Sequence, residues 1–129
     1  MRGLGSSYRD GKGVEEDLTE AMKWYREASD KGDGDADSDI GGLYHNGRGV
    51  PKNDATAVSW FRKGAGKGSD YAMGDLAACY WTGTGVEKSA REAIKWWKMA
   101  ADKGNEEAKE NLKAALEQFD ESGQPRTRK

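Results

Sequence analysis

Apolar side chains recur along the chain at the spacing of one helical face, and glycines interrupt this spacing at regular intervals. Ala36, Ile40, Leu43 and Tyr44 form one such group. They share a face because an α-helix completes a turn in about 3.6 residues. The pattern predicts an all-α protein. We expect a partial helix at about residues 2–10, and complete helices at about 18–31, 36–46, 54–67, 72–82, 90–103 and 106–119.

The sequence matches itself without a gap when it is shifted by 36 residues. The matching positions include Tyr8, Tyr44 and Tyr80; Gly11, Gly47 and Gly83; Ala21, Ala57 and Ala93; and Trp24, Trp60 and Trp96. This period predicts one domain over residues 1–120, built from three units of two helices each at about 1–35, 36–71 and 72–107. Helix 106–119 would cap the array, and residues 121–129 would form a flexible tail.

Residues with capping and turn preferences separate the predicted helices. A Gly-x-Gly-Val motif follows the first helix of each pair, where glycine supplies the positive φ that a helix end needs. Good N-cap residues precede the second helix of each pair: Asp17, Asn53 and Ser89. That second helix ends at a glycine: Gly32, Gly68 and Gly104. Because the motif recurs in every unit and no strand precedes it, we interpret it as a turn rather than as a phosphate-binding loop.

An aromatic residue follows each repeated tryptophan. The resulting pairs are Trp24–Tyr25, Trp60–Phe61 and Trp96–Trp97. Small alanines share the same helical face, and repeated apolar positions at helical spacing usually mark a buried face. We therefore expect these pairs to lie in the core and not to line a ligand site.

Charge and composition exclude several classes of function. Among the 129 residues, 21 are Lys or Arg and 23 are Asp or Glu, so the net charge is −2. A surface that neutralises phosphates needs an excess of positive charge, so we expect no nucleic-acid partner. The apolar runs are too short to span a membrane and no hydrophobic leader follows Met1, so we predict neither membrane insertion nor a signal peptide. The single cysteine, Cys79, excludes an internal disulfide.

The repeated residues resemble the Sel-one-like repeat (SLR), a relative of the tetratricopeptide repeat. The family pattern Ala-x-x-x-Leu-Gly-x-x-Tyr-x-x-Gly-x-Gly-Val-x-x-Asp-x-x-x-Ala-x-x-Trp reads here as Ala36, Ile40, Gly41, Tyr44, Gly47, Gly49, Val50, Asn53, Ala57 and Trp60. The resemblance extends over residues 4–119. It implies an α-solenoid of antiparallel helix pairs, curved into a short right-handed superhelix. It also implies a non-catalytic adaptor that holds a protein or peptide on its concave face. We accordingly expect a monomer without a metal or a cofactor.

Four glycines depart from the family pattern. Gly42, Gly64, Gly66 and Gly74 stand where the family usually carries alanine or another helix former. Each glycine inside a helix costs about 1 kcal/mol relative to alanine. We therefore expect the second and third units to be only modestly stable.

If the copied residues build the core, recognition falls to residues that differ between the units. On the helix face that lines the groove of such arrays, the candidate partner-binding residues are Arg9, His45, Asn46, Tyr71, Trp81, Glu110 and Glu117. Tyr71 and Trp81 are aromatic, and aromatic residues often anchor a bound partner. Glu110 and Glu117 favour a basic partner. Trp81 has a second interpretation, as an ordinary packing residue between neighbouring helices.

Two chemical sites are weaker candidates. Residues 33–40 alternate acidic positions as a calcium loop does, but Tyr44 stands where such a loop needs a bidentate glutamate. A nucleophilic pair of Cys79 and His45 would need facing side chains, and helical spacing places the two on different faces of their helices. We therefore favour neither site.

Two other function classes remain open. Some cysteine-rich relatives were described as binding or cleaving β-lactams, but they carry a paired cysteine in each repeat, and this chain has Cys79 alone. The chain could instead be a structural module, either a fragment of a longer array or a designed repeat protein without a natural ligand.

Overall fold

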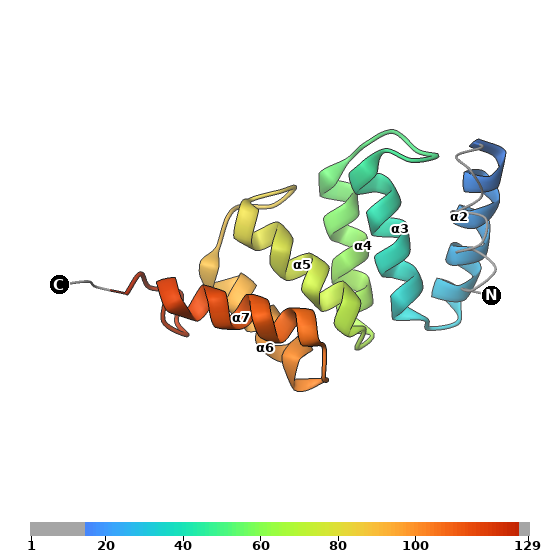
Figure 1. The fold of residues 1–129 in the computed structure, drawn as a ribbon. Coiled ribbons are helices and arrows are strands. Elements are labelled where there is room, and N and C mark those ends of the chain that lie inside the picture. The colour runs from blue at the N-terminus through green and yellow to red at the C-terminus, as the bar shows by residue number, and fades with distance from the viewer. Residues whose placement is uncertain (1–14, 127–129) are drawn as a thin grey trace.

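The computed structural model describes residues 15–126, and this part of the chain forms consecutive α-helices and no strand (Figure 1). The helices are α2 (Glu15–Asp30), α3 (Gly34–Asn46), α4 (Asp54–Gly66), α5 (Asp70–Thr82), α6 (Ala90–Asp102) and α7 (Glu106–Gln118). The all-α fold and the complete helices predicted from the sequence are confirmed, with ends shifted by a few residues. The partial helix predicted at 2–10 lies outside the described residues. None of the described helices combines the length and the apolar character needed to cross a membrane.

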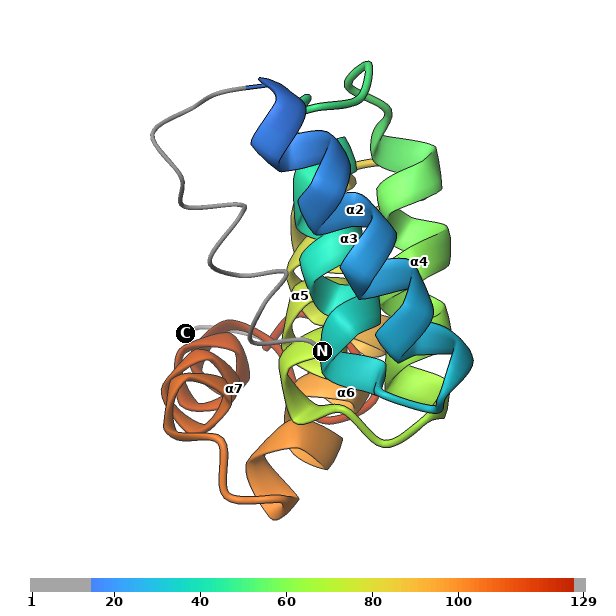
Figure 2. The same ribbon diagram turned by 90° about the vertical axis from the view of Figure 1, so that its right-hand side faces the viewer.

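Successive helices pack against each other in two layers. α3 packs on α4 and α5 packs on α6, while α4–α5 and α6–α7 contacts join one pair to the next. In Figure 2, α3, α5 and α7 lie on one side of the array and α4 and α6 on the other. Figure 1 shows the helix directions turning progressively, from α3 to the nearly perpendicular α7. We call the surface presented by α3, α5 and α7 the groove face.

The helix ends follow the predicted turn chemistry. Asn53 and Ser89 each accept a hydrogen bond from the backbone N–H three residues further on, which confirms them as the N-caps of α4 and α6. Asp17 lies within α2 instead of capping it, because that helix begins at Glu15. Gly47 and Gly83 end α3 and α5 with φ angles of 64° and 75°, which L-residues rarely adopt.

The core is built from the second aromatic residue of each predicted pair. Tyr25, Phe61 and Trp97 are buried, with exposed fractions of 0%, 5% and 5%. The repeated tryptophans are only half-buried: Trp24, Trp60 and Trp96. The prediction that the pairs lie in the core is therefore wrong for their first members. Consecutive helical residues point about 100° apart, so only one member of a pair can face the core fully.

Basic side chains cover two of the half-buried tryptophans. The Arg26 guanidinium carbon and the Lys63 Nζ lie 5.3 Å and 4.7 Å from the centroid of the Trp60 ring. The Lys95 Nζ lies 5.2 Å from the Trp96 centroid. Each such contact contributes about 0.5–1 kcal/mol at an exposed site. The Arg26 contact also ties α2 to α4, so the Trp60 ring connects neighbouring helix pairs.

A polar network is buried where α2, α3 and the end of α4 meet. Asp37 is fully buried. Its Oδ1 accepts a hydrogen bond from Ser29 Oγ at 2.5 Å, and its Oδ2 lies 2.8 Å from Lys67 Nζ. One repeat later, Met73 takes the position of Asp37, Ala65 that of Ser29 and Lys103 that of Lys67. Met73 and Ala65 are buried. The chain therefore uses a polar contact at one interface and an apolar contact at the next.

Two helical glycines permit close packing between α3 and α4. A Cβ atom added at Gly41 would lie 2.4 Å from Phe61 Cε1, and one at Gly64 would lie 2.6 Å from the carbonyl oxygen of Gly34. A larger residue at either position would push the helices apart. The other glycines that depart from the family pattern have open space around the Cβ position: Gly42, Gly66 and Gly74.

Residues 119–126 fold back as a hook against α6 and α7. Phe119 pairs with Pro125 in an isolated β-bridge, and the Asp120 carboxylate accepts backbone hydrogen bonds within the hook. Glu121 forms an ion pair with Lys98 of α6 at 3.0 Å. The sequence assigns residues from 121 onward to a flexible tail. Up to residue 126 the chain instead forms a turn that these polar contacts hold in place.

Candidate functional site

The groove face carries a polar residue at the same repeat position in each of its helices. Asp39, Asp75 and Asn111 lie 36 residues apart on α3, α5 and α7. Glu107 lies one helical turn before Asn111. Asp39, Asp75 and Glu107, which we call the groove carboxylates, line one common cavity. The repeat geometry therefore gathers negative charge from three helices on one surface.

Three cavities meet at Asp75, which contributes to the lining of each. The first, of about 400 Å³, lies between α5 and α7 and is lined by residues that include Tyr71, Gly74, Ala78, Trp97 and Glu107. The second, of about 310 Å³, includes His45, Phe61, Cys79, Thr82 and Thr84. The third, also of about 310 Å³, includes Asp39, Gly42, Asn46 and Arg48. The first cavity forms because α5 and α7 make little direct contact.

Burial raises the pKa of the Asp75 carboxyl to about 6, from an ordinary value of 3.8. The Ser38 hydroxyl opposes this shift by donating a hydrogen bond to Asp75 Oδ2 at 2.5 Å. The neighbouring Glu107 and Asp39 carboxylates raise the pKa further, whereas His45 lowers it. Among residues 15–126, no lysine or arginine forms an ion pair with Asp75. The groove thus holds a carboxylate whose charge destabilises the fold.

Replacing Asp75 by asparagine should stabilise the fold at neutral pH. Because the folded-state pKa exceeds the unfolded-state value, the carboxyl contributes stability below about pH 4 that is lost as the pH rises through about 6. The amide can still accept the Ser38 hydrogen bond without carrying charge. We expect Asp75→Asn to gain about 2–3 kcal/mol at pH 7 and much less near pH 4. Urea unfolding at both pH values measures this gain, and a gain independent of pH would contradict the shifted carboxyl.

The predicted partner-binding residues that the structure describes do not line one common cavity. Tyr71 is 58% exposed and lines the 400 Å³ cavity. His45 and Asn46 line the second and third cavities, respectively. Glu110 and Glu117 are exposed on α7 and line none of these three cavities. Arg9 lies outside the described residues.

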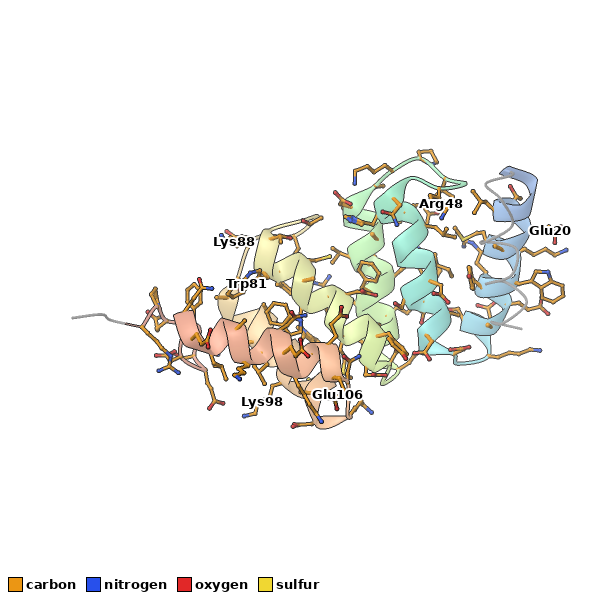
Figure 3. All side chains as sticks on the ribbon, viewed as in Figure 1. Glu20, Arg48, Trp81, Lys88, Lys98 and Glu106 are labelled. Carbon is orange, nitrogen blue, oxygen red and sulfur yellow. The ribbon has the colours of Figure 1, made fainter. Side chains whose placement is uncertain are left out.

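Trp81, near the end of α5, packs against a residue of α6 and a residue of the hook. Its ring centroid lies 5.5 Å from that of Trp97 and 5.5 Å from that of Phe119, which it meets edge to face. Figure 3 shows Trp81 at the end of α5, close to the C-terminal part of α7. These contacts correspond to the packing interpretation of Trp81, although its partners lie on α6 and in the hook.

Asp75 and its neighbours are not among the residues that the sequence predicts for binding. The predicted residues differ between the units, whereas Asp39 and Asp75 are identical copies at one repeat position. The sequence does hold one signal for this site. Positions 39, 75 and 111 are all polar, and they lie on a helix face that carries no repeated apolar residues. The burial of Asp75 arises from contacts between units, which the spacing within one helix does not show.

His45 and Cys79 line the same cavity, although helical spacing places them on different faces of their helices. His45 Nδ1 lies 2.8 Å from Asp54 Oδ1. Burial raises the pKa of the Cys79 thiol to about 11, and the Asp75 and Asp54 carboxylates raise it further. A nucleophilic cysteine reacts as the thiolate, and a thiol with this pKa stays protonated at neutral pH. The electrostatics therefore oppose a nucleophilic role for Cys79.

The acidic residues in 33–40 have partners within the protein. Asp33 caps α3, Asp35 accepts a hydrogen bond from Ser69, and Asp37 pairs with Lys67. In the described part of the chain, no group of three or more His, Cys, Asp or Glu side chains is arranged to hold a metal ion. These acidic residues therefore serve capping and packing between repeats.

The comparisons with known proteins agree with this architecture. The family model of the Sel1 repeat matches residues 1–33, 35–69 and 70–105. The structure of c5321, a protective antigen of uropathogenic Escherichia coli strains with an SLR fold, is 37% identical over 90% of this chain and 25% of that chain, with a TM-score of 0.79. A Sel1 repeat protein from Oxalobacter formigenes is 34% identical over 98% of this chain and 51% of that chain, with a TM-score of 0.78.

A third solved structure shares the fold at lower identity. Helicobacter pylori cysteine rich protein B is 21% identical over 85% of this chain and 95% of that chain, with a TM-score of 0.70. A comparison with curated proteins found no match. The chain spans a quarter of the E. coli protein and about half of the O. formigenes protein. Sel1 repeat proteins are generally helical scaffolds for protein interaction. Three matched repeats that cover most of its length show that this chain belongs to the Sel1 repeat family.

Proposed function

We propose that the chain is a non-catalytic scaffold whose groove face binds a cationic segment of a partner protein. The observation that carries this proposal is Asp75, a carboxylate at the meeting point of three cavities that pairs with no lysine or arginine of residues 15–126. A carboxyl with a strongly shifted pKa in a cleft is a candidate functional group, because selection for stability alone would remove it. A lysine or arginine of the partner would supply the missing positive charge.

The surrounding residues support a cationic ligand. Asp39 and Glu107 line the same 400 Å³ cavity as Asp75, and Glu110 and Glu117 extend the negative charge along α7. Arg48 is the basic residue in the lining of the third cavity, and it lies in the turn after α3 (Figure 3). Negative charge therefore predominates where α5 faces α7.

Other residues would contribute contact area. Tyr71, exposed at the edge of the 400 Å³ cavity, offers an aromatic anchor. His45 and Asn46 would contact the segment near α3. In this proposal Trp81 shapes the groove wall through its packing with Trp97. We expect the chain to bind as a monomer, because one chain supplies every groove carboxylate.

Short fluorescein-labelled peptides test the proposal. One set carries paired arginines or lysines in a glycine–serine background, and a matched set carries glutamate at the same positions. We expect the basic peptides to bind with a Kd on the order of 10–100 μM, measured by fluorescence polarisation, because the groove is small. The acidic peptides should not bind. Affinity should fall as salt is added, because the carboxylates are partly exposed to solvent.

Matched variants test whether peptide binding depends on the groove carboxylates or only on the net charge of the protein. Asp75→Asn should weaken basic-peptide binding by about tenfold, the loss of one charge-assisted contact. Glu27→Gln removes the same charge from an exposed site on α2 that lines none of the three cavities, and should leave binding unchanged. If both variants bind like wild type, or if basic and acidic peptides bind equally, the groove does not recognise positive charge.

A further inference from the structure

We propose that the second cavity, which residues of α3, α4 and α5 line, is a pocket for an aromatic side chain of the partner's cationic segment. This inference rests on the proposed function, and it identifies a second residue of the bound segment besides the lysine or arginine at Asp75. The cavity volume of about 310 Å³ lies at the lower end of the range usual for ligand sites, about 300–1,000 Å³. One repeat later, aromatic rings of the chain itself pack at the equivalent positions, which we call the counterpart site.

The counterpart site lies where α5, α6 and the hook meet. A shift of 36 residues relates the second cavity to it: His45 to Trp81, Phe61 to Trp97 and Gly83 to Phe119. The Trp81 ring packs on Trp97, and the Phe119 ring meets Trp81 edge to face, with 5.5 Å between the centroids in each contact. An imidazole is smaller than an indole, and glycine has no side chain. The second cavity therefore lacks two large aromatic side chains that its counterpart contains.

A contact with α4 holds the His45 side chain at the edge of the second cavity. His45 Nδ1 lies 2.8 Å from Asp54 Oδ1, and Lys52 Nζ lies 3.2 Å from the same oxygen. His45 is exposed, whereas Trp81 at the equivalent position is half-buried. In the third unit Ala90 replaces Asp54, and its methyl group offers no such contact to Trp81. The pairing with Asp54 therefore keeps the imidazole away from the space that an indole fills in the counterpart site.

The walls of the second cavity suit an aromatic ring. Thr82 donates its hydroxyl proton to the Ala78 carbonyl oxygen, so the Thr84 hydroxyl, 2.7 Å away, donates to Thr82 Oγ1. Both hydroxyl protons are thus used within the protein, and neither is left for a ligand. Phe61 adds the ring of a buried aromatic residue, and Cys79 adds a small, weakly polar thiol.

Asp75 connects this pocket with the cationic site, because it lines both the second cavity and the 400 Å³ cavity. A segment that places a lysine or arginine at Asp75 can therefore place a neighbouring aromatic residue in the second cavity. The edge of an aromatic ring carries partial positive charge, so a carboxylate beside the pocket is compatible with a ring. The expected recognition element is an aromatic residue close in sequence to a lysine or arginine.

Peptides that differ at one residue test the pocket. Next to the arginines of the basic peptide, one version carries phenylalanine, a second leucine and a third alanine. We expect wild type to bind the phenylalanine peptide about tenfold more tightly than the alanine peptide, with leucine between them, because a buried ring adds apolar contact. In NMR spectra the methyl signals of Thr82 and Thr84 should shift more with the phenylalanine peptide, since a ring current acts on methyl groups that face it.

A transplanted pair of residues should close the pocket. His45→Trp/Asp54→Ala gives the second unit the residues of the counterpart site, so that an indole fills the cavity. We expect this variant to bind the phenylalanine and alanine peptides equally, with the affinity that wild type has for the alanine peptide. Ser59→Trp adds a tryptophan on the exposed surface of α4, outside the three cavities, and should keep the tenfold preference.

The wild-type measurements decide the proposal even if the transplanted variant does not fold, which circular dichroism would show. Equal affinity of wild type for the phenylalanine and alanine peptides, or for the phenylalanine and leucine peptides, would overturn the aromatic pocket. So would a folded transplanted variant that keeps the tenfold preference. Failure of all three basic peptides to bind wild type would instead contradict the proposed function.

Discussion

Replacing Asp37 by alanine is expected to lower the free energy of unfolding by about 3–5 kcal/mol. The carboxylate is fully buried, and its two oxygens contact Ser29 Oγ and Lys67 Nζ. Its loss leaves the half-buried ammonium group without its counter-charge and the Ser29 hydroxyl without its acceptor. Urea unfolding followed by far-UV circular dichroism measures the change.

The third unit provides the matched control for this prediction. At the equivalent positions it has Met73 and Ala65 in place of Asp37 and Ser29, and both are buried. The double variant Ser29→Ala/Asp37→Met should therefore recover most of the stability that Asp37→Ala loses, because replacing a buried polar group by an apolar one of similar volume is often neutral or stabilising. A double variant as unstable as Asp37→Ala would show that the interface requires the ion pair itself.

Replacing Trp97 by alanine should lower the free energy of unfolding by about 3–5 kcal/mol, and replacing its neighbour Trp96 by only about 1–2 kcal/mol. Trp97 is 5% exposed and packs against Trp81, so its removal leaves a cavity between α5 and α6. Trp96 is half-buried, and the exposed Lys95 covers its ring. Solvent can fill the space that the Trp96 ring leaves.

The two variants form an internal comparison, since they remove the same side chain from adjacent positions of α6. Denaturant midpoints at one pH and salt concentration give the two losses. Equal losses would mean that both rings lie in the core, as the sequence pattern alone predicts. A larger loss for Trp96→Ala would contradict the orientation of α6.

The helical architecture was predictable from the sequence because its causes are local. The 36-residue period defined the helix pairs, and capping residues such as Asn53 and Ser89 defined where the second helices begin. Positive-φ glycines such as Gly47 and Gly83 marked where the first helices end. Each signal depends on residues within a few positions of each other.

The candidate site was predictable only in part. Helical spacing placed Tyr71, His45 and Asn46 on the groove face, where they line cavities. It did not reveal the raised pKa of the half-buried Asp75 carboxyl, because Ser38, Asp39 and Glu107 approach it from other helices. It also could not separate Gly64, which packs against Gly34, from Gly74, which faces open space.

The sequence by itself determined the helices, their ends and their order, because repeat period, capping and turn preference act over short stretches of chain. Only the tertiary structure decided which aromatic of each pair is buried, which acidic side chain loses contact with solvent and which glycine permits close packing. Those properties depend on the distance and angle between neighbouring helices, and side chains from several repeats jointly set that geometry.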